Sequence, residues 1–431
     1  MNGMRNKILG LILCLFVGAV LSIVSARLVA AEEALDLQPL IDEALKNNRD
    51  LLVAESRWKA STYRIPQAKS LPDPMVMVGY QNEGWNTYTF GEMEGAQWMY
   101  SISQMFPFFG KRGIKGEMAA QEAGSSGEMY RAQRLKTVAT VKELYYDLFL
   151  AHKDIDLVRD KTALFSRIED AALARYSSGM APQQEVLMAQ TEKYMLLERE
   201  LMLQQKVQSL EAMLNAAVGR DVNAPLGRPA EPVPTSFARD REEMQAAALA
   251  LSPELRSREK MLFASEARVG MANKEFYPDV TLAASVFKRT GPYEDMWSLT
   301  ATFNIPLYFG AKQKAVAEAR SLTLGARQEL EAGRLMVASS MRDNYSMVQT
   351  AEKLMDLYKQ GMIPKASQDV EAALAGYRTG RVEAITVISR LKALIDYETL
   401  YWAQFVEREK AIARLDALTG TAIPEAGEKK K

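Results

Sequence analysis

The chain has almost none of the residues on which catalytic and metal-binding sites commonly depend. Its 431 residues include one cysteine, Cys14, and one histidine, His152. A disulfide framework needs pairs of cysteines, and zinc or nucleophile clusters combine several cysteines and histidines. His152 stands alone in a helix-favouring stretch, which predicts a surface side chain. The segment Gly110-Lys111-Arg112-Gly113 also lacks the spacing of a phosphate-binding loop. We therefore expect no enzyme activity, no cofactor and no metal-ligand set.

An excess of charge of either sign is also absent. Lysine and arginine together number 54, as do aspartate and glutamate, so the formal net charge is zero. Proteins bind nucleic acid and anionic surfaces through an excess of basic residues, and an acidic tail would appear as an excess of acidic residues. We therefore expect no nucleic-acid partner.

Long apolar runs are missing except at the N-terminus. Residues 1–31 have a basic start, an apolar run over 8–26 and small residues at the end, which is the pattern of a secretory signal peptide. An uncleaved membrane anchor is the alternative. Cys14 lies inside this run and follows Leu13, which is not small, so a lipoprotein cleavage site is not expected. The mature chain would then contain no cysteine.

What the sequence does contain is an internal repeat. The motif Tyr-x-x-Gly begins at Tyr176 and again at Tyr377, 201 residues later. Val218-Gly219 resembles Thr419-Gly420 at the same spacing. Self-similarity at a fixed spacing indicates one structural unit that occurs twice. The predicted divisions are a first repeat at 32–220, a proline-rich linker at 221–240, a second repeat at 241–420 and a polar tail at 421–431.

Long helix-favouring runs surround each Tyr-x-x-Gly motif, so each motif is predicted to be the turn of a helical hairpin. The turns fall at 176–181 and 377–381, between predicted helices at 111–176 and 182–218, and at 311–377 and 382–418. At about 1.5 Å per residue the longer arm extends roughly 100 Å. No single globular core needs helices of that length, so the sequence predicts a long and thin assembly.

The helix at 182–218 carries apolar residues at a seven-residue spacing: Leu187, Met188, Tyr194, Met195, Leu201 and Met202. A heptad pattern predicts coiled-coil packing, and the breadth of this one indicates contact with two neighbours, as in a ring of helices. Thioether sulfur suits Cu(I), but methionine is also common in irregular cores. We interpret Met188, Met195 and Met202 as core residues rather than as a copper path.

Four short segments change to a period of two, at 75–81, 97–106, 280–287 and 296–305. In the last of them Trp297, Leu299, Ala301 and Phe303 alternate with polar residues, and aromatic residues gather at the strand ends. This pattern is typical of a transmembrane β-barrel. A soluble sheet edge packed under helices is the alternative. Four strands cannot close, and open edges in lipid leave unpaired backbone groups, so several chains would have to pool their strands.

Prolines predict two interruptions. Pro66 and the prolines at 72 and 74 are predicted to end a first helix at 36–64, with Asp36 as its N-cap. Pro364 lies inside the second long helix, where an interior proline predicts a kink and a place at which the helix could hinge. The alternative, which we favour, is a static kink.

Taken together, these features resemble the TolC-type outer membrane efflux protein family. The resemblance covers essentially the whole mature chain. It rests on the export signal, the two strand pairs, the two Tyr-x-x-Gly turns, the strand-to-helix joints Phe-Pro-Phe-Phe-Gly-Lys-Arg and Ile-Pro-Leu-Tyr-Phe-Gly-Ala-Lys, and the closing Ala417-Leu418-Thr419-Gly420. The Leu-Pro-Asp-Pro segment and Ile363-Pro364-Lys365-Ala366 are similar to the branch associated with heavy-metal efflux.

The resemblance implies a mainly α fold with a membrane β-barrel, in which a homotrimer closes a 12-stranded barrel that continues as a coiled-coil helical barrel. It implies an exit duct in the outer membrane of a Gram-negative bacterium, extending into the periplasm. The implied partners are outer membrane lipid, a periplasmic adaptor (membrane fusion protein) and an inner membrane pump. The cargo would be metal cations, or else drugs or other small molecules. The alternative is a periplasmic coiled-coil adaptor or scaffold protein.

The resemblance also implies roles for individual residues. Adaptor binding maps onto the turns, at Tyr176, Ser178, Gly179, Met180, Tyr377, Thr379, Gly380 and Arg381. Some members carry two aspartates after the second turn that ring the pore entrance. Thr386 and Ser389 occupy those positions here, so the acidic ring is absent. Glu185 and Glu383 are the nearest acidic candidates for lining the entrance, and the alternative for both is a solvated helix face.

Overall fold

The computed structural model describes residues 35–420. The predicted signal peptide at 1–31 and the polar tail at 421–431 lie outside this range. The described chain is mainly helical and contains one four-stranded sheet, which confirms that part of the predicted fold. It divides into two compact units. We call residues 35–48, 137–237 and 346–413 the hairpin unit, and residues 49–136, 238–345 and 414–420 the sheet unit.

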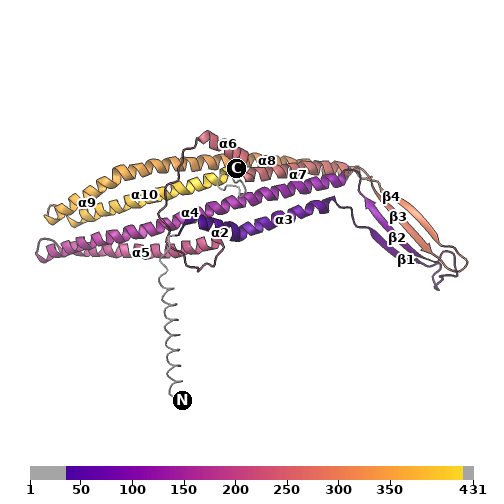
Figure 1. Cartoon of the computed structure of the whole chain (residues 1–431), viewed down its shortest axis with the longest axis horizontal. Helices are drawn as coiled ribbons and strands as arrows, with labels where there is room; N and C mark the ends of the chain where they lie inside the picture. The colour runs from indigo at the N-terminus through magenta and orange to yellow at the C-terminus, as the bar shows by residue number, and fades with distance from the viewer. Residues whose placement is uncertain (1–34, 421–431) are drawn as a thin grey trace, which may run out of the picture. The chain divides into compact units, whose positions relative to one another are not determined.

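The elements follow one another along the chain as Figure 1 labels them. In order they are α2 (Leu37–Asn47), α3 (Arg49–Lys69), β1 (Met75–Gln81), β2 (Gln97–Phe106), α4 (Lys111–Ser177), α5 (Gln183–Val218), α6 (Arg241–Leu251), α7 (Pro253–Lys274), β3 (Asp279–Lys288), β4 (Met296–Asn304), α8 (Phe309–Asp356), the π-helical turn η1 (Leu357–Met362), α9 (Ile363–Arg378) and α10 (Ala384–Thr419).

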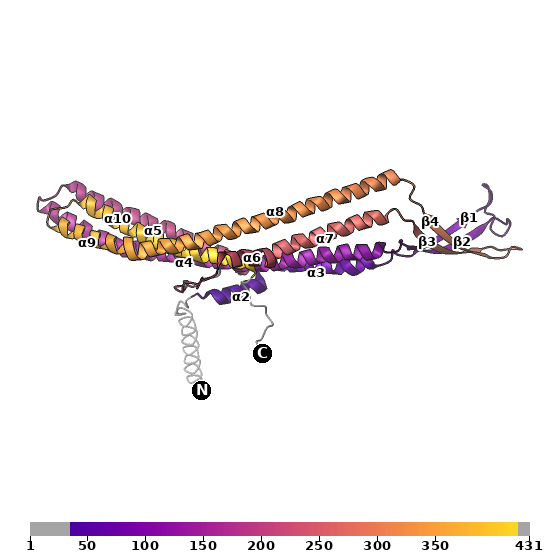
Figure 2. The same cartoon turned by 90° about the horizontal axis from the view of Figure 1, so that it is seen from above.

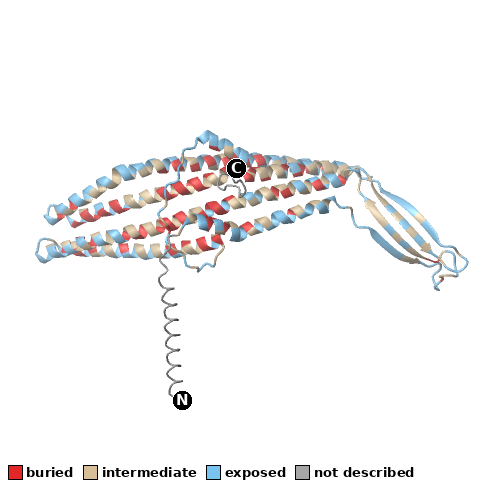
Figure 3. Ribbon diagram, viewed as in Figure 1, coloured by how far each residue is buried: buried red, intermediate tan, exposed pale blue. Residues whose placement is uncertain are grey.

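In the sheet unit, β1 to β4 form one antiparallel sheet in sequential order. Directly opposed residues share a face, so the pairing Val78↔Tyr100, Tyr100↔Val286 and Val286↔Trp297 defines an apolar face. Nine of its large side chains are between 47% and 75% exposed: Val76, Val78, Tyr100, Ile102, Leu282, Val286, Trp297, Leu299 and Phe303. Figure 3 shows the strands without the buried stripes that mark the helices.

The other face of the sheet is largely polar. Ser101 and Ser285 lie opposite each other and their hydroxyls are 2.9 Å apart. Thr300 and Thr302 belong to the same face, because they oppose Ala283 and Thr281. We call this side the polar face. The alternation predicted from the sequence is therefore present in the paired strands.

The helices of the sheet unit are fixed to the strands through buried polar contacts. Lys111, the first residue of α4, is 3% exposed, and its ammonium group lies 2.9 Å from the Asp279 carboxylate at the start of β3. Asp279 also accepts a hydrogen bond from the backbone N–H of Phe108. Figure 2 shows α3 beside the first part of α4, where the rings of Trp58 and Tyr130 stack with centroids 5.6 Å apart. The contacts of Phe108 and Lys111 tie the joint between β2 and α4 to the start of β3.

In the hairpin unit, α4 and α5 form one hairpin, and α9 and α10 form the second (Figure 1). A common apolar core joins them, with members such as Phe165 on α4, Val186 on α5, and Ile388 and Leu391 on α10. These four side chains are at most 7% exposed. A core between the two hairpins is therefore formed within one chain.

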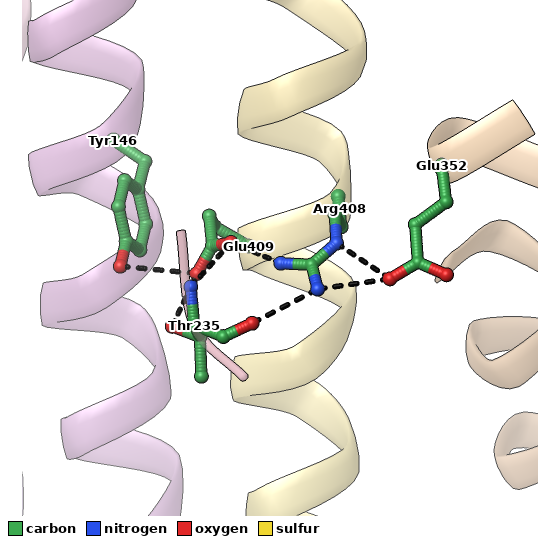
Figure 4. Close-up of polar contacts among 5 residues, drawn as sticks. All are labelled: Tyr146, Thr235, Glu352, Arg408 and Glu409. Carbon is green, nitrogen blue, oxygen red and sulfur yellow. Dashed lines mark hydrogen bonds and ion pairs between the residues drawn. The ribbon is translucent and has the colours of Figure 1, made fainter. Parts of the chain in front are cut away.

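A buried ionic network ties the linker to the hairpin unit (Figure 4). Glu409 on α10 is 2% exposed and accepts hydrogen bonds from Arg408, from the backbone N–H of Thr235, and from the hydroxyls of Thr235 and Tyr146. Arg408 in turn donates to the Thr235 carbonyl at 2.9 Å and to Glu352 on α8 at 2.9 Å. One carboxylate thus connects α4, α10 and the segment between the repeats.

The structure corrects two predictions about helix boundaries. A single helix at 36–64 is wrong, because Asn48 separates α2 from α3 and donates its side-chain amide to the Ala217 carbonyl at 2.8 Å. Asp36 is the N-cap residue of α2, as predicted, although its side chain makes no capping bond. Pro66 does not end α3, which continues to Lys69. Pro66 is exposed, so water can reach the carbonyl that loses its N–H partner.

The second long helix changes from α-helical to π-helical hydrogen bonding shortly before Pro364. Leu357–Met362 form a π-helical turn, and α9 then starts at Ile363. Pro364 therefore falls in the first turn of α9, directly after the π-helical turn, in which the N–H of Ile363 donates to the Tyr358 carbonyl. The wider turn accommodates the proline, and a hinge at this point stays a prediction.

One prediction about exposure is corrected and another stays a prediction. Of the three methionines assigned to the core of α5, Met188 packs against the apolar core, whereas Met195 and Met202 are 50% and 59% exposed in the single chain, so their place in a core stays a prediction. They lie with Leu187, Tyr194 and Leu201 on a side of α5 that no other part of the described chain buries. His152, expected at the surface, is half-buried on α4.

Candidate functional site

The first Tyr-x-x-Gly motif ends α4 in a left-handed turn. Gly179 has φ +71°, a conformation that glycine adopts without steric cost. The N–H of Met180 donates to the Arg175 carbonyl at 2.8 Å, and the N–H of Gly179 donates to the Tyr176 carbonyl at 3.0 Å. This pair of bonds is the Schellman motif, which satisfies carbonyls that a helix end would leave unpaired.

The second motif repeats the same geometry at the end of α9. Gly380 has φ +75°, Arg381 donates its N–H to the Gly376 carbonyl at 2.9 Å, and Gly380 donates to the Tyr377 carbonyl at 3.1 Å. A Cβ atom added to Gly179 or Gly380 would meet no other group within 4 Å. A side chain at either glycine would therefore strain the backbone without clashing with a neighbour.

The two tyrosines of the repeat differ in their surroundings. Tyr176 is 44% exposed, whereas Tyr377 is fully buried. Tyr377 belongs to the apolar core of the hairpin unit, where α4 contributes Ala172 and α5 contributes Val186. The second turn is therefore anchored against the first hairpin.

Three side chains join the hairpins at their tips, and we call Arg175, Tyr377 and Glu185 the tip latch. The Arg175 guanidinium lies 4.6 Å from the centre of the Tyr377 ring and donates to the Tyr377 carbonyl at 2.7 Å. The Tyr377 hydroxyl donates to the Glu185 carboxylate at 2.9 Å. Burial and this hydrogen bond to Glu185 raise the pKa of Tyr377 to about 12, so the phenol remains a donor at neutral pH.

The four residues predicted to line a pore entrance do not share one environment. Glu185 is half-buried in the tip latch, so a purely solvated face is the wrong interpretation for it. Glu383 and Ser389 are exposed. Thr386 is half-buried and donates its N–H to the Glu383 carbonyl at 3.1 Å. Glu185 and Thr386 stand 201 residues apart, so they are equivalent positions of the repeat with different contacts.

The remaining residues assigned to the tips form the exposed surface of the two turns. The Ser178 hydroxyl donates to the Ala174 carbonyl at 2.9 Å, and the Thr379 hydroxyl to the Gly376 carbonyl at 3.0 Å, so both cap helix ends. Met180 is 70% exposed, and Arg381 is exposed as well. Together with Tyr176 they offer apolar, polar and cationic contacts around two rigid turns.

Arg175 is a candidate site residue that sequence reasoning missed. It directly precedes Tyr176, and the repeat places Gly376 at the equivalent position, 201 residues later. That difference between the repeats was a signal, because a long cationic side chain in one copy alone can make contacts that the other copy cannot.

Other kinds of site were sought across residues 35–420. In that range no group of three or more histidine, cysteine, aspartate or glutamate side chains is arranged to hold a metal ion. Within the same residues, no helix combines the length and the apolarity needed to cross a membrane.

Comparison with known proteins gives a consistent result. The outer membrane efflux protein family matches residues 40–220 and 245–399. The solvent efflux pump outer membrane protein SrpC of Pseudomonas putida is 24% identical over 304 residues, and the match covers 64% of this chain and 62% of SrpC. The cobalt-zinc-cadmium resistance protein CzcC of Cupriavidus metallidurans is 21% identical, and that match covers 90% of both chains.

A solved structure of CusC, described as forming a transmembrane channel, has a TM-score of 0.77 against this chain. The likeness covers 89% of this chain and 91% of CusC at 16% identity, which shows a shared fold. Since the family match spans most of the described helices and strands, the chain belongs to the outer membrane efflux protein family and is an outer membrane protein.

Proposed function

We propose that the chain is the exit duct of a tripartite efflux system, a passive passage without turnover of its own. In this proposal an inner membrane pump and a periplasmic adaptor deliver substrates to it. The observation that carries the proposal is the exposed apolar face of the β1–β4 sheet. Large apolar side chains on the outside of a sheet, with polar residues on the other side, fit a barrel wall with lipid outside and water within.

The two edges of the sheet support a trimer. β1 and β4 are the outermost strands, and each has an edge without a partner strand in the described chain. Unpaired backbone groups cost several kcal/mol each in lipid, so such edges must be joined. Three copies in a ring would pair every β1 with a neighbour's β4 and close a barrel of about 12 strands.

The helices offer a second surface for the same assembly. Leu187, Tyr194 and Leu201 follow one another at seven-residue spacing on α5 and are 53%, 71% and 66% exposed. A heptad stripe of this kind is buried when another helix packs against it. In the trimer this helix would belong to the neighbouring copy.

The tips are the proposed meeting point with the adaptor and the place of gating. The tip latch holds the two hairpins of a chain together, and the exposed residues around it are free to contact a partner. An adaptor that binds the open arrangement better than the latched one would shift the population towards open.

The names of the relatives bear on the cargo. SrpC is named for solvent efflux and CzcC for cobalt, zinc and cadmium resistance. Metal cations are the cargo that we propose first, with organic small molecules as the second candidate. An adaptor or scaffold role is not favoured, because the family match and the amphipathic sheet both belong to a channel.

Replacing Gly179 or Gly380 with valine should weaken coupling to the adaptor. A β-branched residue at positive φ costs roughly 1–2 kcal/mol, and nothing crowds the position, so the turn would change shape while the helices stay folded. The readout is cross-linking in cells through a Ser178→Cys substitution, since the only natural cysteine, Cys14, lies in the predicted signal peptide. We expect capture of an adaptor, reduced several-fold by either valine.

A matched control is Gly325→Val on α8, where an added Cβ also meets nothing within 4 Å and φ is not positive. This variant should capture the adaptor as the Ser178→Cys protein does. Undiminished capture in both tip variants would contradict the assignment of the turns. Absence of any captured adaptor in the Ser178→Cys protein would count against the duct itself.

A further inference from the structure

The methionines of the sheet all lie on one face. The four strands contain five: Met75, Met77, Met99, Met105 and Met296. The pairing places each of them on the polar face, since Met77 opposes Ser101, Met105 opposes Thr281, and Met296 opposes Phe287, which in turn opposes Met99. The apolar face carries valine, leucine, isoleucine and aromatic side chains but no methionine. The methionines of the strands therefore all lie on the polar face, together with Phe287 and Ala283.

The same pairing arranges these methionines in successive levels along the strands. Met75 opposes Ser103 and Met77 opposes Ser101, while Met99 opposes Gly79. Residues on one face recur at every second position, which is about 7 Å along a strand. From the helical joint towards the β1–β2 loop the levels carry Met105, Met75, Met77 and then Met99. Met296 lies at the level of Met99. We call these five residues the methionine ladder.

The ladder does not pack as a core within the chain. Met75, Met77 and Met296 are 62%, 54% and 42% exposed. Gly79 leaves room for Met99, whose methyl carbon lies 3.2 Å from the place that a Cβ on Gly79 would occupy. Met105 and Met75, and likewise Met77 and Met99, are diagonal neighbours across β1 and β2, a separation that long side chains can bridge. Open space and flexible thioethers are therefore present together on this face.

The polar face has few ligands suited to hard metal ions. Its one carboxylate among the strand residues is Asp279, at the helical joint, and that group is bound to Lys111. Hydroxyls such as those of Ser101 and Thr300 are poor partners for soft cations. Thioether sulfur, in contrast, selects soft ions such as Cu(I) over hard divalent ones.

We propose that the methionine ladder is a series of weak binding sites for soft monovalent cations, Cu(I) or its redox-stable analogue Ag(I). This inference rests on the proposed duct, because the polar face becomes the lumen only when the barrel closes. Neutral thioethers bind such an ion without trapping it by charge. In a passage, each site must bind the ion strongly enough for it to enter and weakly enough for it to leave. Several methionines about 7 Å apart along the strands meet that requirement.

The test uses Ag(I) as silver nitrate with the full-length protein purified into lipid nanodiscs. Bound silver is measured by elemental mass spectrometry after equilibrium dialysis in nitrate buffer. We expect saturable binding, reduced at least five-fold when all five ladder methionines are replaced by leucine. Leucine conserves volume and apolarity, so the barrel should be retained. The matched control replaces the exposed helical residues Met129, Met213 and Met261 with leucine and should bind silver as the unaltered chain does.

The oligomeric mass of each sample is recorded alongside silver binding, which separates two kinds of failure. Trimers with equal silver binding in the ladder variant and the unaltered chain would overturn the ladder and leave the duct standing. A chain that inserts into lipid as a monomer would overturn the closed barrel and the ladder together. Loss of silver binding in the helical control alone would place the site on the helices and overturn the ladder.

Discussion

Replacing Glu409 with alanine is expected to lower the free energy of unfolding of the hairpin unit by about 3–5 kcal/mol, the cost typical of removing one partner from a buried ion pair. Glu409 is 2% exposed and is the common acceptor for Arg408, Thr235 and Tyr146 (Figure 4). Without it, the Arg408 guanidinium keeps one carboxylate partner, Glu352, and the Thr235 hydroxyl loses its acceptor. The measurement is the midpoint of thermal unfolding in detergent, followed by circular dichroism at a fixed scan rate.

The neighbouring carboxylate Glu407 provides a control on the same helix. It is bound to Lys410 at 3.1 Å but its side chain is 41% exposed, so Glu407→Ala should change the free energy of unfolding by less than about 1 kcal/mol. Equal midpoints for the two variants would mean that the network is not buried in the assembled protein. Glu409→Gln should fall between them, because the amide keeps an acceptor but loses the charge.

The second large effect is expected at the tips. The double variant Arg175→Ala/Tyr377→Phe removes the hydrogen bond to Glu185 and the contacts of the guanidinium with Tyr377, while it keeps the buried ring. Hydrogen bonds to charged groups contribute about 1.5–3 kcal/mol each, so loss of two should shift the balance from closed to open by tenfold or more. We expect several-fold higher average conductance in planar bilayers, with Tyr377→Phe alone giving a smaller increase.

Arg378→Ala is the control for this experiment, because Arg378 adjoins Tyr377 in sequence but is exposed. It removes a cation from the same turn without touching the latch, and its conductance should equal that of the unaltered protein. If the double variant conducts no more than Arg378→Ala does, the latch does not hold the passage closed.

Much of the architecture can be predicted from local sequence patterns. The period of two in Met296–Asn304 predicts both the strand and its apolar face, because the alternation reflects water on one side only. The Tyr-x-x-Gly motifs predict the two hairpin turns, since a glycine after a helix favours the left-handed conformation found at Gly179 and Gly380. These signals need no knowledge of distant residues.

What the sequence did not predict depends on contacts between distant segments. The break at Asn48 requires the Ala217 carbonyl, 169 residues away. The burial of Tyr377 and the role of Arg175 depend on how the hairpins pack, and they lie 202 residues apart. The exposure of Met195 could not be inferred either, because a heptad stripe does not say whether its partner lies in the same chain.

The repeat itself was informative where its copies differ. Equivalent positions predict equivalent structure, and the two glycine turns agree within a few degrees of φ. Yet Arg175 stands opposite Gly376 in the alignment of the repeats, and Glu185 opposite Thr386. One hairpin thus supplies both charged groups that hold the tyrosine of the other. The contact between the two hairpin tips is therefore made by residues in which the two copies of the repeat differ.

The central claim is that three copies of this chain close one barrel, and native mass spectrometry tests it most directly. The protein is extracted with mild detergent from the outer membrane fraction of cells that express the full sequence. The account predicts the mass of three chains, because three sheets of four strands leave no open edge. A monomer in that fraction, or recovery of the chain from the soluble periplasm, would contradict the account.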